Sequence, residues 1–359
     1  MIDIFKEWYQ RNFSDPQAVI LALLLLVGFV VVIFLGDMLA PLLASVIIAY
    51  LLEGTVAKLQ QYGVARLWAV VSVFMLFMAL LIYTILGLIP LLSQQVTELI
   101  SEVPNMVTKG QQSLLTLHES YPNYFSEEQV RELMSGVRAD LTAFGQSVFS
   151  KSIASIPVLI TVLVYLILVP IMVFFFLKDK QSIVQWFTAY LPEQRRLAGE
   201  VWHEMDRQIG NYIRGKILEI IIIGVVTYIA FYMMGLNYAP LLAALVGISV
   251  LVPYIGAAVV TIPVALIAYF QWGLSADFGY LMLVYGIIQA VDGNVLVPIL
   301  FSEAVNLHPV AIIAAVLFFG GVWGFWGVFF AIPLATLVAA VLRAWPRATQ
   351  TDESDRLLE

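Results

Sequence analysis

The sequence from residue 217 to residue 342 constrains the fold most, because this long stretch contains no lysine or arginine. Inside it, residues 285–333 are almost wholly apolar and yet include Asp292, Asn294 and Pro298. A bilayer tolerates polar side chains only where neighbouring protein or a water-filled cavity solvates them. Proline also leaves a backbone carbonyl that must find another partner. The stretch therefore predicts membrane segments with a polar role, most simply the passage of a solute or an ion.

The overall composition indicates that the whole chain is a membrane protein. It is 61% hydrophobic and 12% charged, with a mean hydropathy of +0.93, whereas about a quarter of the residues in soluble domains are charged. The net charge of −7 comes without a continuous basic stripe, which argues against a nucleic-acid partner. We therefore expect an all-α integral membrane protein whose apolar surface faces membrane lipid.

The long apolar runs have to turn, because a helix rises about 1.5 Å per residue and the hydrocarbon core is about 30 Å thick. The run 18–52 would be about 52 Å long as one helix, and Gly36-Asp37 is its turn signal. The run 239–270 would be about 48 Å long, and Pro253 and Gly256 are expected to break it. Some spans are thus broken or re-entrant. The expected spans, about eight in number, are 18–35, 38–52, 67–89, 153–177, 217–235, 239–270, 280–300 and 309–342.

Polar segments divide the expected spans, and Pro90 is expected to end the third one. Apolar residues at helical spacing within 91–152 predict an amphipathic periplasmic insertion. Its helices are expected to pack on each other or on a neighbouring subunit, or else to lie on the membrane surface. The amphipathic helix in 178–216 packs under the membrane domain, binds lipid head groups or gates the pore. The expected divisions are residues 1–90 (spans one to three), 91–152, 153–177 (span four), 178–216, 217–342 (spans five to eight) and 343–359 (a cytoplasmic tail).

The basic residues predict the orientation of the chain. Of the 18 lysine and arginine residues, only Lys109, Arg131, Arg138 and Lys151 fall in the insertion placed outside. Positively charged residues gather on the cytoplasmic side of membrane proteins. Both termini are therefore expected in the cytoplasm.

Motifs for known chemistry are missing from the sequence. Arg214-Gly215-Lys216 is followed by Ile217, so it is not a phosphate-binding loop of the Walker type. His203-Glu204 lacks the second histidine of a zinc protease, and Gly247-Ile248-Ser249 lacks the second glycine of a serine elbow. With no cysteine and only 3 histidines, which lie far apart, no metal site is expected. We expect neither an enzyme nor a protein with a cofactor.

Asp292 is the leading candidate for a polar role, because it lies in an apolar context close to Asn294 and Pro298. It has two interpretations: a group that takes part in transport or gating, or a cap for backbone groups that a helix break leaves free. Glu219, just inside another apolar run, is interpreted as a side chain that snorkels or pairs with a nearby basic residue.

Two further groups complete the candidate residues. Glu303 and His308 flank the turn before Pro309, either as interfacial anchors or at the mouth of a pathway. The glycines between 320 and 327 allow close helix packing or form a hinge. The candidate pathway or gating residues are Asp292, Asn294, Pro298, Glu303, His308, Pro253, Tyr254, Gly256, Gly320, Gly321 and Gly324.

Three stretches carry a family resemblance: LVPYIG at 251–256, DGNVLVPILFSEAVNLHP at 292–309 and GGVWGFWGVFFAIPLA at 320–335. They resemble the AI-2E transporter family, in particular its PerM-type permeases, and the resemblance covers most of the chain. Many members have Glu-Asp or Glu-Gly directly before the asparagine of the second stretch. In this sequence the acidic residue, Asp292, stands two residues before Asn294, and the motif carries less negative charge.

The resemblance implies a multi-pass protein of the bacterial inner membrane, homo-oligomeric like relatives that form pentamers. Some members are assigned the export of autoinducer-2, and others the exchange of sodium or lithium for protons. A small polar solute of the first kind would need hydroxyl and amide partners such as Tyr254 and Asn294. Cation exchange would need an acid, for which Asp292 is the leading candidate. The alternative is a non-transporting oligomeric scaffold, supported by the insertion at 91–150 and the helix at 193–214.

Overall fold

The computed structural model describes residues 16–120, 136, 156–190, 196–253, 255–301 and 307–344, and all regular structure in these ranges is helical. The predicted all-α fold is confirmed for this part of the chain. The rest of the insertion after residue 120, in which a second amphipathic helix is expected from apolar residues between 130 and 144, lies outside the described ranges apart from residue 136. The helices are α2 (Pro16–Gln61), α3 (Arg66–Tyr83), η1 (Thr84–Leu88), α4 (Ile89–Ser120), α6 (Ile156–Lys178), α7 (Lys180–Ala189), α8 (Arg196–Met233), α9 (Ala239–Ser249), α10 (Ile255–Trp272), α11 (Ala276–Val291), η2 (Asp292–Leu296), α12 (Val297–Phe301), α13 (Pro309–Phe329) and α14 (Ala331–Ala344).

Among the described residues, 6 helical runs are long and apolar enough to cross a membrane. Three shorter apolar helices belong to the expected spans six and eight, which are both interrupted. The total of eight crossings stays a prediction. The candidate spans are Met38–Gln61, Arg66–Gly110, Thr161–Lys178, Asp206–Met233, Ile255–Trp272 and Ala276–Phe301.

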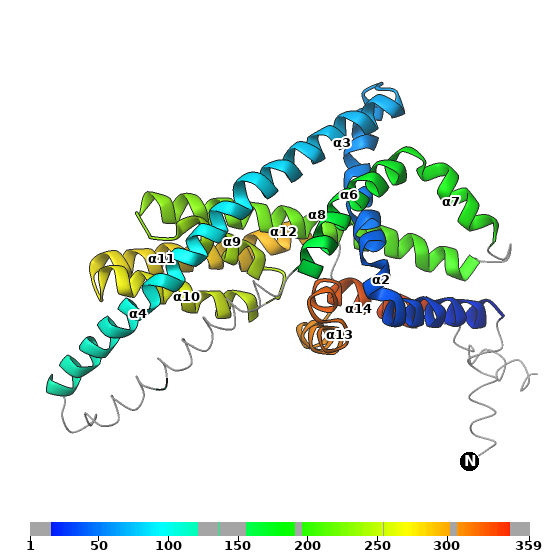
Figure 1. The fold of residues 1–359 in the computed structure, drawn as a ribbon. Coiled ribbons are helices and arrows are strands. Elements are labelled where there is room, and N and C mark those ends of the chain that lie inside the picture. Colours follow the sequence, from blue (N-terminus) through cyan, green and yellow to red (C-terminus); the bar gives the residue numbers. More distant parts are fainter. Residues whose placement is uncertain are drawn as a thin grey trace, which may run out of the picture. The chain divides into compact units, whose positions relative to one another are not determined.

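The predicted separation of two helices at Gly36-Asp37 is wrong, because α2 is helical throughout. A glycine inside a helix costs only about 1 kcal/mol relative to alanine, which is too little to end a helix in an apolar run. The ribbon of α2 nevertheless changes direction along its length (Figure 1). Pro41 lies inside the helix, and proline is the usual cause of such a bend.

The helix of the third expected span does not end at Pro90, while the end of the membrane span there stays a prediction. Helix α3 continues through η1 into α4, and Figure 1 shows the run as one long helix. The turn η1 is a π-helix, in which the N–H of Ile89 donates to the backbone oxygen of Thr84. This wider turn lies directly before Pro90 and accommodates the missing N–H of proline. The first half of the insertion is therefore helical, as expected, and continuous with the span before it.

The chain forms two compact units, each built from separate segments. Unit 1 comprises 1–70, 171–216 and 299–359, and unit 2 comprises 71–170 and 217–298. The helices α3, α6, α8 and α12 contribute residues to both units.

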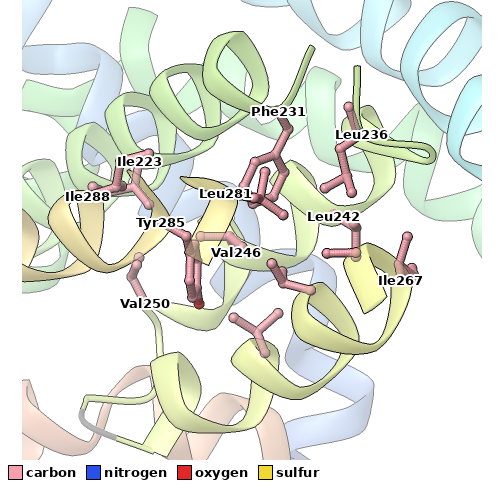
Figure 2. Close-up of a cluster of buried hydrophobic side chains, with 14 residues drawn as sticks. Ile223, Phe231, Leu236, Leu242, Val246, Val250, Ile267, Leu281, Tyr285 and Ile288 are labelled. Atoms are coloured by element: carbon pink, nitrogen blue, oxygen red, sulfur yellow. The ribbon is translucent and has the colours of Figure 1, made fainter. Parts of the chain in front are cut away.

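The core of unit 2 is formed by α8, α9, α10 and α11 (Figure 2). Phe231 and Tyr285 meet at its centre with ring centroids 6.1 Å apart. Helices α8 and α9 approach closely where two glycines meet, since a Cβ added to Gly247 would lie 3.1 Å from the Cα of Gly224. The core residues are Ile223, Phe231, Leu236, Ala239, Leu242, Val246, Val250, Val260, Val264, Ile267, Ala268, Leu281, Tyr285 and Ile288.

Two glutamine side chains hold the start of α9 in unit 2. Gln95 of α4 accepts a hydrogen bond from the N–H of Leu241 at 2.9 Å, which satisfies one of the free N–H groups of the first helical turn. Gln271 of α10 accepts from the N–H of Asn237 and donates to the backbone oxygen of Gly235, both at 2.8 Å. The loop between α8 and α9 is thus fixed by side chains that are distant in the sequence.

Unit 1 is held by an ion network between α2, α3 and α7. Glu53 lies 3.3 Å from both Arg66 and Lys180, and Arg66 also donates to the backbone oxygen of Leu177 at 2.7 Å. The network is partly exposed, so it contributes about 1 kcal/mol or less for each ion pair. Its main consequence is to fix the ends of three helices relative to one another.

Candidate functional site

Asp292 lies at the end of a buried stripe on α11. Leu281, Tyr285 and Ile288 occupy the buried face of this helix and belong to the core of unit 2. Asp292 follows Ile288 by about one turn and is only 8% exposed. A carboxyl group in an apolar region requires a proton, a cation or hydrogen-bonding partners. Asp292 therefore has the burial expected of a membrane carboxyl group with a polar role.

Asp292 also begins the π-turn η2, whose hydrogen bonds reach one residue further than those of an α-helix. The N–H of Val297 donates to the backbone oxygen of Asp292. Pro298 follows and has no N–H to donate, so the wider turn lets the chain continue as α12. The disturbance expected at Pro298 therefore lies in the turn before it. Turns of this kind are frequent at functional sites.

Asn294 makes a local hydrogen bond within the same turn. Its Nδ2 donates to the backbone oxygen of Ala290 at 2.8 Å, which gives a partner to a carbonyl whose usual helical donor is displaced by the π-turn. Asn294 is thus exposed and caps a backbone group of the turn, whereas Asp292 is buried, and both interpretations of Asp292 stay predictions.

The first π-turn, η1, has the same construction without an acid. Thr84 stands where Asp292 stands in η2, and Pro90 follows at the position of Pro298. The hydroxyl of Thr84 donates to the backbone oxygen of Leu80 at 2.9 Å, and η1 contains no buried residue. The π-turn is therefore a way to place proline in a long helix, and the buried carboxyl group is what distinguishes η2.

Helix α8 contains a buried polar stripe that the sequence analysis missed. Lys216, Glu219 and Thr227 are 4%, 2% and 0% exposed, and Glu219 and Thr227 each lie about one turn from Ile223, a core residue of unit 2. The snorkelling alternative for Glu219 is wrong, because its side chain is only 2% exposed in the middle of α8 (Arg196–Met233), whereas its pairing with a nearby basic residue stays a prediction. With Ile223 between Glu219 and Thr227, the residues of this stripe follow one another three or four positions apart, and that spacing could have revealed them.

Lys216 packs against an aromatic side chain of unit 1. Its Nζ lies 5.1 Å from the ring centre of Phe301, within the range of a cation–π contact. The ring of Tyr212 lies 5.6 Å from the same ring. Gly215 allows this approach, because an added Cβ would lie 2.9 Å from the Phe301 ring.

The predicted break at 252–256 is confirmed, since α9 ends at Ser249 and α10 begins at Ile255. Pro253 lies in the turn between them and its carbonyl accepts from the N–H of Ile255 at 2.7 Å. Gly256 packs against the backbone of Ser249, and a Cβ added to it would overlap the carbonyl oxygen of Ser249. The turn is therefore closed by backbone contact and tolerates only glycine at 256.

The last apolar run turns back on itself at Gly324, which has φ 58° and ψ −132°. Only glycine adopts such a conformation readily. Gly327 packs on the backbone of Phe319, where a Cβ would overlap the carbonyl oxygen, and α13 packs against α14. The arms Pro309–Gly324 and Ala331–Val341 are too short to cross a membrane alone. The run is thus a broken element, and of the two interpretations of its glycines, Gly324 makes the turn whereas Gly320 and Gly327 allow close packing.

Replacing Gly324 by alanine is expected to destabilise unit 1 by about 1–3 kcal/mol, because alanine is strained at this backbone conformation. The measurement is the thermal unfolding midpoint of the purified protein in detergent. Gly321→Ala is the matched control, since no atom lies within 4 Å of its added Cβ. Equal midpoints for the two variants would contradict the assignment of Gly324 as the turning point.

The remaining candidates are local or lie outside the described residues. His308 is the N-cap of α13, where its Nδ1 accepts from the N–H of Val310 at 3.3 Å. Gly320 is packed against Val328, since an added Cβ would lie 2.8 Å from that side chain. Tyr254 and Glu303 fall outside the described ranges. Among the described residues of unit 2, Asp292 and Glu219 are buried, and the chain is interrupted at 252–256.

Comparisons with known proteins cover nearly the whole chain. The family described as AI-2E family transporter matches residues 20–347. The Escherichia coli K12 protein named "Putative permease PerM" is 49% identical over 346 residues, which are 96% of this chain and 98% of that protein. The Bacillus subtilis 168 protein named "Putative transport protein YueF" is 25% identical over 335 residues, 91% and 89% of the two chains. A Thermotoga maritima protein named "Putative transport protein" is 23% identical over 344 residues, 94% and 97%.

Proposed function

The chain belongs to the AI-2E transporter family, and on this premise we propose that it is a permease that exchanges a monovalent cation for a proton through Asp292. The observation that carries the proposal is the burial of this carboxyl group at the edge of an apolar core. A carboxyl group that binds a proton and a cation in turn couples the movement of the two, because it cannot hold both. Burial makes that exchange obligatory, since the bare carboxylate is poorly solvated.

Glu219 is proposed as the second carboxyl group of the same site. On α8, Glu219 is followed on the same face by Ile223, and on α11, Asp292 is preceded on the same face by Ile288. Ile223 and Ile288 belong to one core and lie next to each other in Figure 2. Glu219 precedes Ile223 by about one turn and Asp292 follows Ile288 by about one turn. We therefore propose that the two buried faces extend past Ile223 and Ile288 towards the same end of the core, where the two carboxyl groups lie side by side.

The break between α9 and α10 supports the same location. Val250, in the turn after α9, is a member of the core that contains Ile288. Two broken helices beside one another commonly form the binding site of a transporter. We propose that the break at 252–256 and the π-turn at 292–296 border the pathway, with Pro253 and Gly256 shaping one side of it.

The family and the charge distribution support a proposal for the membrane, the oligomeric state and the orientation of the protein. We propose a homo-oligomer in the bacterial inner membrane, with both termini in the cytoplasm and the segment 91–152 outside. The distribution of lysine and arginine supports this orientation. A small polar solute of the autoinducer-2 type is the second transported class that the family relationship supports.

The test is a flux assay with the purified protein in liposomes that contain a pH-sensitive dye. Sodium, lithium, potassium and a small neutral diol are supplied in turn, with and without a proton gradient. Cation-dependent proton movement above that of empty liposomes is expected. Uptake of the diol alone would favour the solute permease, and no flux with any substrate would overturn both.

A further inference from the structure

Helix α7 carries a cluster of exposed aromatic side chains. Trp186, Phe187 and Tyr190 are 58%, 61% and 74% exposed. The ring centroid of Trp186 lies 4.9 Å from that of Phe187 and 5.1 Å from that of Tyr190. The three side chains, together with Ile183, occupy one face of the helix, because they lie three, four and seven positions after residue 183. This face is apolar, and the ring of Trp186 contacts the rings of Phe187 and Tyr190.

The position of α7 in the chain places it where a membrane span ends. The candidate span of α6 ends at Lys178, and only Asp179, with φ −104° and ψ 18°, separates it from α7. Helix α7 has 10 residues, so it is about 15 Å long and reaches only half-way across a hydrocarbon core of about 30 Å. It therefore begins at the membrane boundary and is too short to cross back.

The amino-acid composition of α7 is typical of a helix at the boundary between membrane and water. Its opposite face carries Gln181, Ser182 and Gln185, and the helix contains no acidic residue. Tryptophan and tyrosine are enriched where the acyl chains meet the head groups, because their rings are apolar and their polar atoms reach water. The exposed aromatic face is also continuous in the chain with the exposed side chains of α6, such as Phe175.

We propose that α7 is an interfacial helix whose aromatic face is buried in the phospholipid head-group region at the end of α6. The partner that covers this aromatic face is the surface of the lipid bilayer. Lys178 and Lys180 stand at its start, where their ammonium groups reach the phosphates. This surface holds the end of α6 at a fixed depth, and through Lys180 and Glu53 it also holds the end of α2. The inference does not depend on which substrate is transported.

Single spin labels on the two faces of α7 test the proposal in the full-length protein. The chain has no cysteine, so Phe187→Cys and Gln185→Cys each create one labelling site. The labelled proteins are reconstituted in vesicles of phosphatidylethanolamine and phosphatidylglycerol. Power saturation then compares collision with oxygen, which partitions into lipid, and with a water-soluble nickel chelate.

The label at 187 is expected to collide several-fold more with oxygen than with the chelate, and the label at 185 is expected to show the opposite preference. Preferential access of the chelate to both labels would overturn the proposal, because the aromatic face would then point into water. Low access of both reagents to the label at 187 would also overturn it, because a second protein surface would then cover this face. A Trp186→Ala variant with the label at 187 should shift that label towards water.

Discussion

Replacing Asp292 by asparagine is expected to reduce cation-dependent proton movement to the level of empty liposomes. Asparagine has nearly the same shape as aspartate, so the π-turn and the core of unit 2 should remain folded. Its amide exchanges no proton near neutral pH and carries no charge to attract a cation. The measurement is the rate of dye response in liposomes after a cation pulse, at equal protein content.

Asp277→Asn provides the matched control for this prediction. Asp277 lies on the same helix, in the first turn of α11, but it is exposed. Its removal is expected to leave the flux unchanged. Glu219→Gln should lower the flux as Asp292→Asn does if the two carboxyl groups form one site. Full flux in the Asp292→Asn variant would remove Asp292 from the mechanism, whatever Glu219 does.

Replacing Gly256 by alanine is expected to destabilise the protein by about 3 kcal/mol or more, because the new methyl group would overlap the carbonyl oxygen of Ser249. The contact is with backbone, so no side-chain rotation can relieve it. The turn between α9 and α10 would have to open, and α10 would lose its contact with α9. The measurement is the thermal unfolding midpoint in detergent, followed by size-exclusion chromatography.

Gly286→Ala is the control for this second prediction. Gly286 lies on an exposed face of α11, and no atom lies within 4 Å of its added Cβ. Helix propensity alone predicts that alanine there is neutral or stabilises by up to about 1 kcal/mol. An unfolding midpoint of Gly256→Ala equal to that of Gly286→Ala would show that the turn tolerates a side chain.

Local signals predicted some features of the fold well. The break at 252–256 was predictable because Pro253 cannot donate to a helix and Gly256 permits the close contact that follows. The glycines inside 309–342 left packing and a hinge open, and the structure shows a turn at Gly324. The same kind of signal failed at Gly36 and Pro90, because a single glycine costs a helix little and a π-turn accommodates a proline.

The candidate site was only half predictable. Asp292 stood out as an acid in an apolar run, but Glu219 was placed at a helix end because the apolar run begins just before it. Helix α8 instead starts twenty-odd residues earlier and buries Glu219 together with Lys216 and Thr227. Helix boundaries depend on packing with other segments, and the one signal near Glu219 is the helical spacing of the residues on its face.

From the sequence alone it follows that this protein is helical, mostly apolar and interrupted at Pro253 and Gly256, because these properties depend on residue type and near neighbours. Only the tertiary structure decides which polar side chains are buried and which elements meet. Phe231 and Tyr285 are far apart in the chain, and their rings meet in one core because α8 and α11 pack there. Such contacts arise from the joint packing of distant segments, which no local pattern encodes.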